Sequence, residues 1–319
     1  MGTISYLTIC FIGIPFITAY NIISAIFRGM GDSKSPMYFI AIACAANIVL
    51  DYVFIGGLHL GPAGAALGTT CAQAISVVIS LCMIIRRRKE FSFSRKDFRP
   101  NRNVMGQILK IGIPIALQDG FIQVAFMIIT IIANQRGLND AAAVGIVEKI
   151  ISFLFLIPSS MLSTVSALGA QNIGAGKRQR ANETLRYAVL ITVGFGIIVG
   201  IFMQFFASPV VALFTDASDA QGAEVVRLGG QYLRGYVWDC MFAGIHFSFS
   251  GYFCACGKSG LSFLHNIIAI TLVRIPGVYL ASTLFPDTLF PMGLATAAGS
   301  LLSAIICVVA FTILNRKKK

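Results

Sequence analysis

Long apolar runs alternate with short polar segments along the whole chain. Runs of about 20 residues or more cover 5–27, 37–55, 63–85, 104–134, 142–168, 185–214, 226–253, 261–284 and 292–314. A helix of about 20 apolar residues is long enough to cross the hydrocarbon core of a bilayer. The pattern therefore predicts an all-α polytopic membrane protein with about nine transmembrane helices. The longer helices must tilt, break or project beyond the lipid.

The composition strengthens this prediction. Of the 319 residues, 56% are hydrophobic and 12% are charged, whereas a soluble domain carries about 25% charged residues. The net charge of +12 raises the question of nucleic-acid binding. The basic residues, however, stand in short blocks between the apolar runs, as they do in the cytoplasmic loops of membrane proteins. We therefore expect the lipid bilayer, and no nucleic acid, as a partner.

Lys and Arg gather at one end of the predicted helices. That end carries Arg28 and Lys34, the segment RRRKEFSFSRKDFRPNR (86–102), GAGKRQR (174–180), Lys258 and RKKK (316–319). The loops at the opposite end (GGLHLGP, NQRGLND, TDASDAQGAE and LFPDTLFP) hold Arg136 as their only Lys or Arg. Because basic loops stay in the cytoplasm, we expect the C-terminus to be cytoplasmic.

An internal repeat relates the two parts of the chain. SAIFRGMGDSKSP (24–36) aligns without gaps to SGYFCACGKSGLS (250–262), with Ser24, Phe27, Gly31 and Ser33 matching Ser250, Phe253, Gly257 and Ser259. Each copy continues with one span, an outer loop that contains Pro, a helix start rich in small residues, and a basic end. Parallel repeats of this kind are a known transporter architecture.

The repeat also predicts how the chain is divided. The second copy begins near residue 104 and holds six predicted spans, while the first holds three. We therefore expect the second half of an N-terminal lobe at 1–90, a basic cytoplasmic linker at 91–103 and a C-terminal lobe at 104–319. Three further helices are expected before Met1, which would also suit the cytoplasmic C-terminus.

Asp51 lies inside an apolar run, where an ionisable group costs free energy and is a functional hypothesis by default. Asn47 precedes it by four residues and shares its helix face, and a short outer loop makes the helix that carries Thr69 its neighbour. These carboxylate, amide and hydroxyl groups suit Na⁺, and the carboxylate alone suits H⁺. The alternative is that Asp51 reaches the membrane interface while Thr69 bonds its own backbone.

Asp239 and Arg274 are predicted near the middle of two adjacent spans. An ion pair is the cheapest arrangement for both, and it would serve either as a structural bridge or in handling substrate or protons. Asp119 lies near mid-depth beside Gln118 and is a further candidate. There Pro114 and Gly120 suggest a locally broken helix whose backbone the polar groups would satisfy.

His246 and His265 stand in apolar stretches. They are interpreted as either hydrogen-bonded core histidines or proton carriers, and the sequence leaves both readings open.

Three sequence segments, in their order and spacing, resemble those of a known family. They are the turn FRGMGDSKSP, the segment NIVLDYVFIGGLHLGPAGAALGTT that follows it, and VSALGAQNIGAGKRQ (165–179). Over its whole length the chain resembles the multidrug and toxic compound extrusion (MATE) antiporters, without their first three transmembrane helices. The resemblance implies two six-helix lobes that face each other around a cavity, which opens alternately to the two sides of the membrane.

The resemblance also implies site residues. One prokaryotic branch of the family has a cation site formed by an Asp on the first helix, an Asn and an Asp one turn apart on the fifth, and a Thr on the sixth. Asn47, Asp51 and Thr69 match the last three, and the first-helix Asp would precede Met1. Asp239 falls on the tenth helix, where other members also place an acid, whereas Arg274 has no family role to transfer.

The expected function is a secondary active antiporter of the bacterial plasma membrane. It would export amphipathic drugs or organic cations in exchange for Na⁺ or H⁺ and need no cofactor besides that ion. An intramembrane enzyme is disfavoured because the chain lacks the clustered motifs of such enzymes. A flippase for lipid-linked oligosaccharides would need several mid-membrane cations for phosphate, and Arg274 is the only one expected. A third alternative is a truncated chain that inserts but transports nothing.

Overall fold

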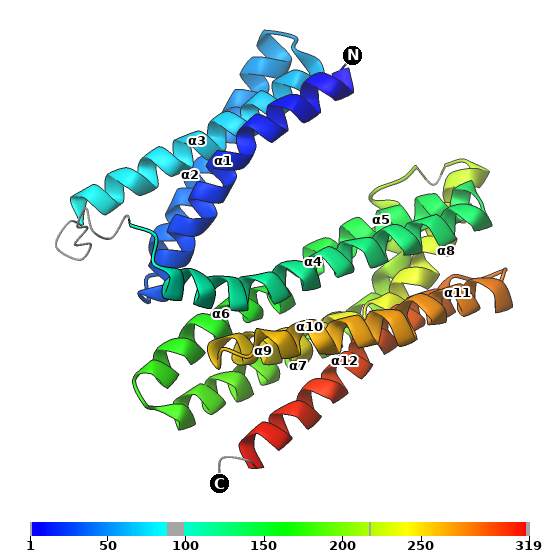
Figure 1. The fold of residues 1–319 in the computed structure, drawn as a ribbon. Helices are drawn as coiled ribbons and strands as arrows, with labels where there is room; N and C mark the ends of the chain where they lie inside the picture. Colours follow the sequence, from blue (N-terminus) through cyan, green and yellow to red (C-terminus); the bar gives the residue numbers. More distant parts are fainter. Residues whose placement is uncertain (1, 88–98, 217, 317–319) are drawn as a thin grey trace. The chain divides into compact units, whose positions relative to one another are not determined.

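The structure, a computed structural model, describes residues 2–87, 99–216 and 218–316. Every regular element within these ranges is helical, as the apolar runs predict. The chain forms two compact units, Met1–Pro100 and Asn101–Lys319 (Figure 1). Of the expected linker 91–103, residues 91–98 lie outside the described ranges.

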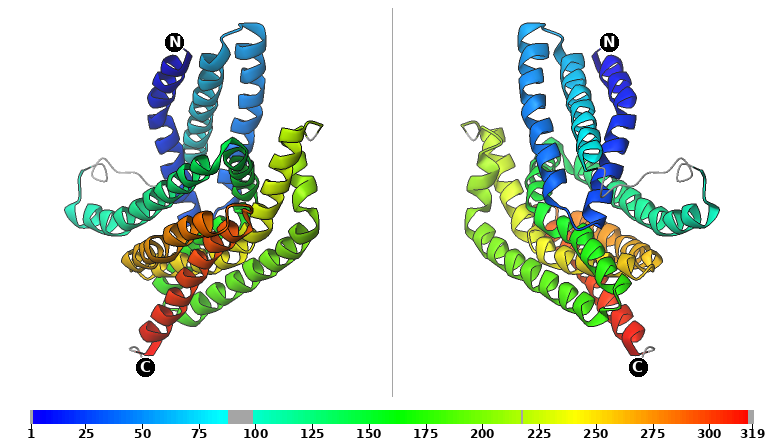
Figure 2. Two further views of the ribbon diagram at one scale, coloured as in Figure 1. Left: turned by 90° about the vertical axis from the view of Figure 1, so that its right-hand side faces the viewer. Right: turned by 90° about the vertical axis from the view of Figure 1, so that its left-hand side faces the viewer.

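The Met1–Pro100 unit is a bundle of three antiparallel helices. Its elements are α1 (Gly2–Gly29), α2 (Lys34–Asp51), the π-helix η1 (Tyr52–Gly57) and α3 (Gly61–Arg86). The views in Figure 2 show the start of α1 and the α2–α3 connection at the same end of this unit. The three predicted spans are confirmed. In the second span, η1 continues the helix after α2 ends at Asp51.

A stripe of small residues determines how α3 packs. Gly64, Gly68, Ala72, Ser76 and Ser80 recur at every fourth position of α3 and are all buried. The stripe faces the preceding helix, since the Ser76 hydroxyl donates to the carbonyl of Phe39 on α2 over 3.4 Å. Helices in a membrane associate through close packing of this kind, because lipid offers no hydrophobic drive between them.

The Asn101–Lys319 unit holds the remaining helices. They are α4 (Arg102–Arg136), α5 (Leu138–Leu154), α6 (Leu156–Gly174), α7 (Arg178–Ala212), α8 (Ala220–Tyr236), α9 (Asp239–Ala255), α10 (Ser259–Ala269), the π-helix η3 (Ile270–Arg274), α11 (Ile275–Leu284) and α12 (Phe290–Arg316). In Figure 1, α4 runs beside the α10–α11 helix, and the two are in contact along their length.

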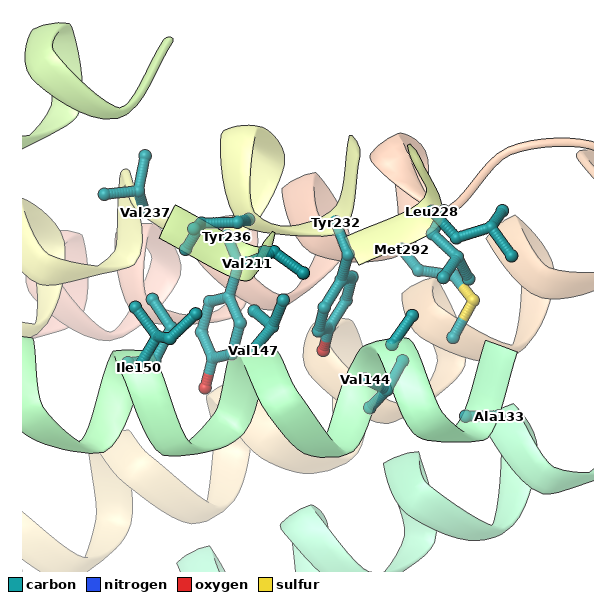
Figure 3. Packing of buried hydrophobic residues seen from close by; sticks show 14 of the residues in the cluster. Ala133, Val144, Val147, Ile150, Val211, Leu228, Tyr232, Tyr236, Val237 and Met292 are labelled. Atoms are coloured by element: carbon teal, nitrogen blue, oxygen red, sulfur yellow. The ribbon is translucent and has the colours of Figure 1, made fainter. Parts of the chain in front are cut away.

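Its core lies between α5, α8 and the helices around them. Tyr232 and Tyr236 of α8 are fully buried, and their rings extend toward Val144 and Val147 of α5 (Figure 3). Burial of aromatic side chains contributes much of the packing energy in such a core. The core therefore fixes α8 in place, and with it the start of α9, where Asp239 lies.

Two of the sequence expectations need correction. The run 226–253 is not one helix, because α8 and α9 are 17 residues each and the chain breaks between them at Val237 and Trp238. Conversely, α4 is continuous through Pro114 and Gly120, where we expected a break. Membrane helices tolerate such residues because neighbouring groups satisfy the freed backbone.

The internal repeat is visible in the backbone. Gly31 and Gly257 have φ angles of 89° and 70°, in the left-handed region that glycine adopts without strain. The next residue in each copy donates its N–H to the matched Phe carbonyl, over 2.9 Å from Asp32 to Phe27 and 2.8 Å from Lys258 to Phe253. Both copies thus end a helix with the same Schellman motif.

Eight helical segments of the described residues are long and apolar enough to cross a membrane. Between 11% and 33% of each apolar window is buried inside the protein, so most of its side chains face outward. Apolar surface on this scale is stable only against lipid. The chain is an integral membrane protein.

Candidate functional site

Asp51 and Asn47 meet at the end of α2. The Asn47 Nδ2 group donates to Asp51 Oδ1 over 3.4 Å, as the four-residue spacing predicts. Both side chains are partly buried. Asp51 is the last α-helical residue, and the π-helix η1 begins immediately after it. Single π-turns occur frequently at functional sites.

Gly68, rather than Thr69, faces this pair from α3. A Cβ atom at Gly68 would collide with Asp51 Oδ1 and would lie 3.4 Å from Asn47 Nδ2. Gly68 belongs to the buried stripe of α3, whereas Thr69 lies about 100° further round the helix. Thr69 is exposed, and its hydroxyl donates to the Ala65 carbonyl of its own helix over 3.1 Å.

Thr69 is therefore not joined to the pair by any hydrogen bond among the described residues. Its neighbour Thr70 points to α1 instead, where its hydroxyl donates to the Ile9 carbonyl over 3.5 Å. The structure thus brings Asn47 and Asp51 together, and Thr69 stays outside their contact. The role of all three as a cation site stays a prediction.

A hollow of about 430 Å³ opens beside Asp51. It is lined by Ile48, Asp51, Tyr52, Ile55 and Gly56, all on one side of the α2–η1 helix. Asp51 is the only ionisable carboxyl group in this lining, so a cation that enters the hollow meets a single negative charge. Through the hollow, an ion outside the bundle can reach the Asp51 carboxylate, while Asn47 stays partly buried.

The donor atoms around Asp51 suit a hard cation after one small movement. As the structure stands, the Asn47 amide presents its nitrogen to the carboxylate. A half-turn of this amide would present its oxygen instead, and carboxylate and amide oxygens are the ligands that hard cations prefer. Among the described residues, no group of three His, Cys, Asp or Glu side chains is placed to hold a metal ion.

Asp239 and Arg274 form the ion pair that the sequence predicts. Arg274 Nη2 donates to Asp239 Oδ2 over 3.3 Å and to the Tyr236 hydroxyl over 3.0 Å. Asp239 is completely buried, and the Arg274 side chain is 9% exposed. The pair is incompletely satisfied, because Asp239 Oδ1 and Arg274 Nε have no hydrogen-bond partner within the described parts of the chain. A buried pair with free atoms is costly to maintain.

The surroundings of Arg274 explain how a guanidinium is accommodated. Its Cζ lies 5.2 Å from the centre of the Phe126 ring of α4, within the range of a cation–π contact. Pro276 lacks an N–H and would clash with the carbonyl of Leu272 in a regular helix, and the π-helix η3 occupies this segment. Gly299 of α12 leaves space for the Arg274 backbone, since a Cβ there would lie 2.8 Å from Arg274 Cβ.

Gln118 and Asp119 face different surroundings. Gln118 is 1% exposed, and neither its Oε1 nor its Nε2 has a hydrogen-bond partner in residues 2–87, 99–216 and 218–316. Asp119 lies on the exposed surface of the Asn101–Lys319 unit, and none of the hydrogen bonds or ion pairs of the described residues involves it. The two residues therefore do not form one site within this unit.

Sequence reasoning missed Gly68, Gly299 and Tyr236. A signal for Gly68 is present, because small residues recur at every fourth position from Gly64 to Ser80. That period marks the face of α3 that contacts α2. Tyr236 stands three residues before Asp239, but the break between α8 and α9 separates them, so its contact with Arg274 depends on tertiary packing.

Comparisons with known proteins agree with this architecture. A family model described as MatE matches residues 3–53 and 114–280. The probable multidrug resistance protein YpnP of Bacillus subtilis (strain 168) is 32% identical over 273 residues, covering 85% of this chain and 60% of its own length. The multidrug export protein MepA of Staphylococcus haemolyticus (strain JCSC1435) is 28% identical over 284 residues, covering 89% and 61%. The chain thus spans about three fifths of these relatives.

Solved structures share the fold. A crystal structure of MATE in complex with MaL6 superposes with a TM-score of 0.91 at 21% identity, covering 99% of this chain and 71% of its own. A transporter of the MOP superfamily from Pyrococcus furiosus reaches a TM-score of 0.92 at 22% identity, covering 99% and 70%. That second protein is described as having a binding pocket of reversed polarity that suggests a different function.

Proposed function

Because the chain belongs to the MatE family, we propose that it acts as a cation-coupled antiporter that exports amphipathic or cationic drugs in exchange for Na⁺ or H⁺. The names of its relatives support drug export. The coupling ion is cargo of the cycle, and the proposal includes no resident cofactor. Residues 1–90 would form part of an N-terminal lobe, 91–103 a linker and 104–319 a C-terminal lobe, with the C-terminus in the cytoplasm.

The observation that carries the proposal is the contact of Asp51 with Asn47 and Gly68. A cation or proton that reaches Asp51 through the hollow would neutralise it and compete with the hydrogen bond from Asn47. Because Asp51 Oδ1 packs directly against Gly68, a shift of the carboxylate would change the contact between α2 and α3. Ion binding would thus change the packing of the bundle.

This change in packing is the coupling step. An ion can shift a conformational equilibrium only by its difference in affinity for the two states. Asp51 supplies that difference if its carboxylate is accessible in one packing of α2 on α3 and enclosed in the other. Drug would then bind the ion-free state more tightly and leave when the ion loads Asp51.

Flipping of lipid-linked oligosaccharides is less well supported. Such a transporter needs several buried cations for phosphate. Among the ion pairs of the described residues, Arg274 and Arg136 have the least exposed cationic side chains, and Asp239 and Asp140 neutralise them. The fold itself does not distinguish drug export from lipid flipping, since a solved structure of the same fold is described as differing in function.

The test is dye transport in vesicles that contain the protein expressed from its own gene, with Na⁺ and pH gradients imposed separately. Asp51→Asn keeps the size and polarity of the side chain but removes the charge, so it should lower gradient-driven dye transport at least tenfold. Asp287→Asn, in an exposed loop, is the matched control and should stay within twofold of the wild type. Gly68→Ala, which forces Asp51 to move, should also lower transport at unchanged membrane levels.

Each result has a defined meaning. If Asp51→Asn transports dye at the wild-type rate, the proposed site is wrong even though export stands. If the wild-type protein moves dye under neither gradient while it is inserted and folded, the chain is a non-transporting member of the family. The gradient that drives wild-type transport identifies the coupling ion.

A further inference from the structure

A basic cavity lies at the turn between α6 and α7. Its volume is about 550 Å³. The lining holds three cationic side chains and one carboxylate, and it consists of Gly176, Lys177, Arg178, Gln179, Arg180 and Glu183. Guanidinium and ammonium groups gathered in this way bind phosphate through charge-assisted hydrogen bonds. The lining therefore favours an anionic occupant.

The positive charge of this cavity is not neutralised within the protein. Of the ion pairs in the described parts of the chain, none involves Lys177, Arg178 or Arg180. The carboxylate of the lining, that of Glu183, accepts a hydrogen bond from Gln179 Nε2 over 3.2 Å instead. The three cations are thus available to a ligand.

Hydrogen bonds fix the backbone that carries these cations. Gly176 has a φ angle of 73°, and the N–H of Lys177 donates to the Asn172 carbonyl over 2.8 Å. Beyond the turn, the Tyr252 hydroxyl of α9 donates to Asn182 Oδ1 of α7 over 2.6 Å. The turn is closed on itself and tied to the end of α9. A ligand therefore orders only side chains when it binds, which lowers the cost of binding.

The cavity lies at the depth of the lipid headgroups. The apolar run 185–214 begins five residues after Arg180, which corresponds to about 8 Å along a helix that rises about 1.5 Å per residue. The headgroup layer extends roughly 5–8 Å beyond the hydrocarbon core on each side of a bilayer. Basic pockets at this depth on the cytoplasmic side bind anionic headgroups, and this end of the chain is the one expected in the cytoplasm.

An apolar face of α7 continues from the cavity into the membrane. Four residues lie within about 20° of Arg180 around the helix axis, and each of them is more than half exposed: Tyr187, Ile191, Ile198 and Phe205. Tyrosine at the edge of a span is typical of the membrane interface. A lipid whose phosphate contacts Arg180 would lay its acyl chain along this face.

We propose that the cavity binds the headgroup of an anionic phospholipid, with the phosphate against Lys177, Arg178 and Arg180 and an acyl chain along the exposed face of α7. A zwitterionic headgroup carries a positive amine that the three cations repel. Inorganic phosphate has the charge but no apolar part that could contact α7. The site goes beyond the proposed transport and does not depend on it.

Lipid binding to the purified whole chain tests the site. Native mass spectrometry in detergent counts the bound lipids as phosphatidylglycerol or phosphatidylcholine with identical acyl chains is added. The wild type should bind its first phosphatidylglycerol at least tenfold more tightly than phosphatidylcholine. Millimolar inorganic phosphate should not displace this lipid, because free phosphate lacks the contact with α7.

Charge variants locate the binding. Each Lys or Arg near a lipid surface strengthens binding about fivefold, so the double variant Arg178→Gln, Arg180→Gln should bind phosphatidylglycerol at least tenfold more weakly. Glu183→Gln removes the carboxylate that repels phosphate and should bind it about threefold more tightly. The matched control is the double variant Arg99→Gln, Arg102→Gln, which makes the same change of charge at exposed residues outside the cavity and should stay within twofold of the wild type.

The outcomes separate a built site from general attraction to basic residues. Equal weakening by the two double variants overturns the site, and so does equal affinity for the two lipids. Displacement of phosphatidylglycerol by inorganic phosphate would mean that the cavity takes the anion without the acyl chain, which also overturns the proposal. If the double variant of Arg178 and Arg180 does not fold, Glu183→Gln decides, because unchanged or weaker binding by that variant contradicts the site.

Discussion

Asp32 closes the turn between α1 and α2 with both of its carboxylate oxygens. Oδ1 accepts the N–H groups of Lys34 and Ser35 over 3.1 and 3.0 Å. Oδ2 accepts the Ser35 hydroxyl and Arg87 Nη1, each over 2.6 Å. The carboxylate thus caps α2 and ties its start to the end of α3. The hydroxyl and N–H of Ser35, followed by Arg87, lower the pKa of Asp32 to about 2.

This shift predicts a pH-dependent stability. Since the pKa is lowered in the folded state, the contribution is fully present above the ordinary value near 4 and is lost as the pH falls toward 2. Because solvent reaches the pair, we expect about 1 kcal/mol. Thermal unfolding in detergent should show Asp32→Asn less stable than the wild type at pH 6, with a much smaller difference at pH 2, where the folded carboxyl is about half protonated. A difference that persists unchanged to pH 2 would show that the charge of Asp32 is not responsible.

At the residue scale, the sequence predicted contacts within one helix better than contacts between helices. Asn47 and Asp51 meet because a spacing of four fixes their common face whatever surrounds them. The orientation of Thr69 depends on which face of α3 packs against α2, and the small-residue stripe places Gly68 there. The rotation of α3 about its own axis is determined by its packing on the other helices. It can be predicted from the sequence only if the small-residue stripe is recognised as the contact face.

At the scale of elements, hydropathy located the helices but not their irregularities. Both π-helices, η1 and η3, overlap predicted spans, and they adjoin or contain a candidate residue, Asp51 or Arg274. The break between α8 and α9 directly precedes Asp239. Hydropathy averaged over about 20 residues cannot distinguish α-helical from π-helical backbone hydrogen bonds, because the side chains are equally apolar in both. The sequence pattern therefore could not predict the local geometry of the candidate sites.

Arg136 shows how a single side chain joins elements at the end of α4. Its guanidinium lies 2.7 Å from Asp140 Oδ1 and is 8% exposed. It also donates to the carbonyl of Ser282 in α11 and to those of Phe285, Pro286 and Thr288 in the α11–α12 connection. The planar fork of arginine can serve several acceptors at once, which lysine cannot. This clamp explains why the loop after α4, otherwise free of Lys and Arg, keeps one.

Removal of the clamp should destabilise the protein. Arg136→Ala removes the donor of four carbonyls, two of them in partly buried hydrogen bonds, and leaves Asp140 unpaired, so we expect a loss of about 2 kcal/mol, and Arg136→Lys should recover part of it. Arg227→Ala is the matched control, because its pair with Glu224 is 50% and 38% exposed and such pairs contribute under about 1 kcal/mol. Chemical unfolding in detergent compares the three. Equal losses for Arg136→Ala and Arg227→Ala would contradict the clamp.

At the scale of the whole molecule, the repeat was the most informative sequence signal. The glycines that it matches, Gly31 and Gly257, both end a helix in a Schellman motif. A positive φ restricts the residue type directly, so the backbone requirement is visible in the sequence itself. The side-chain environments of the two turns differ, since Asp32 stands where the second copy has Lys258.

The charge distribution predicts the orientation of the chain in the membrane. At the end opposite the basic loops, the cations Arg136 and Arg227 are paired with Asp140 and Glu224. Basic residues near the spans oppose translocation, so the end with Ala175 should be cytoplasmic and the end with Asp287 external. With the eight native cysteines replaced, a cysteine at Asp287 should react with a membrane-impermeant maleimide in intact cells. A cysteine at Ala175, which is also exposed, should react only after permeabilisation; the reverse pattern would place the C-terminus outside and invert the direction of the proposed transport.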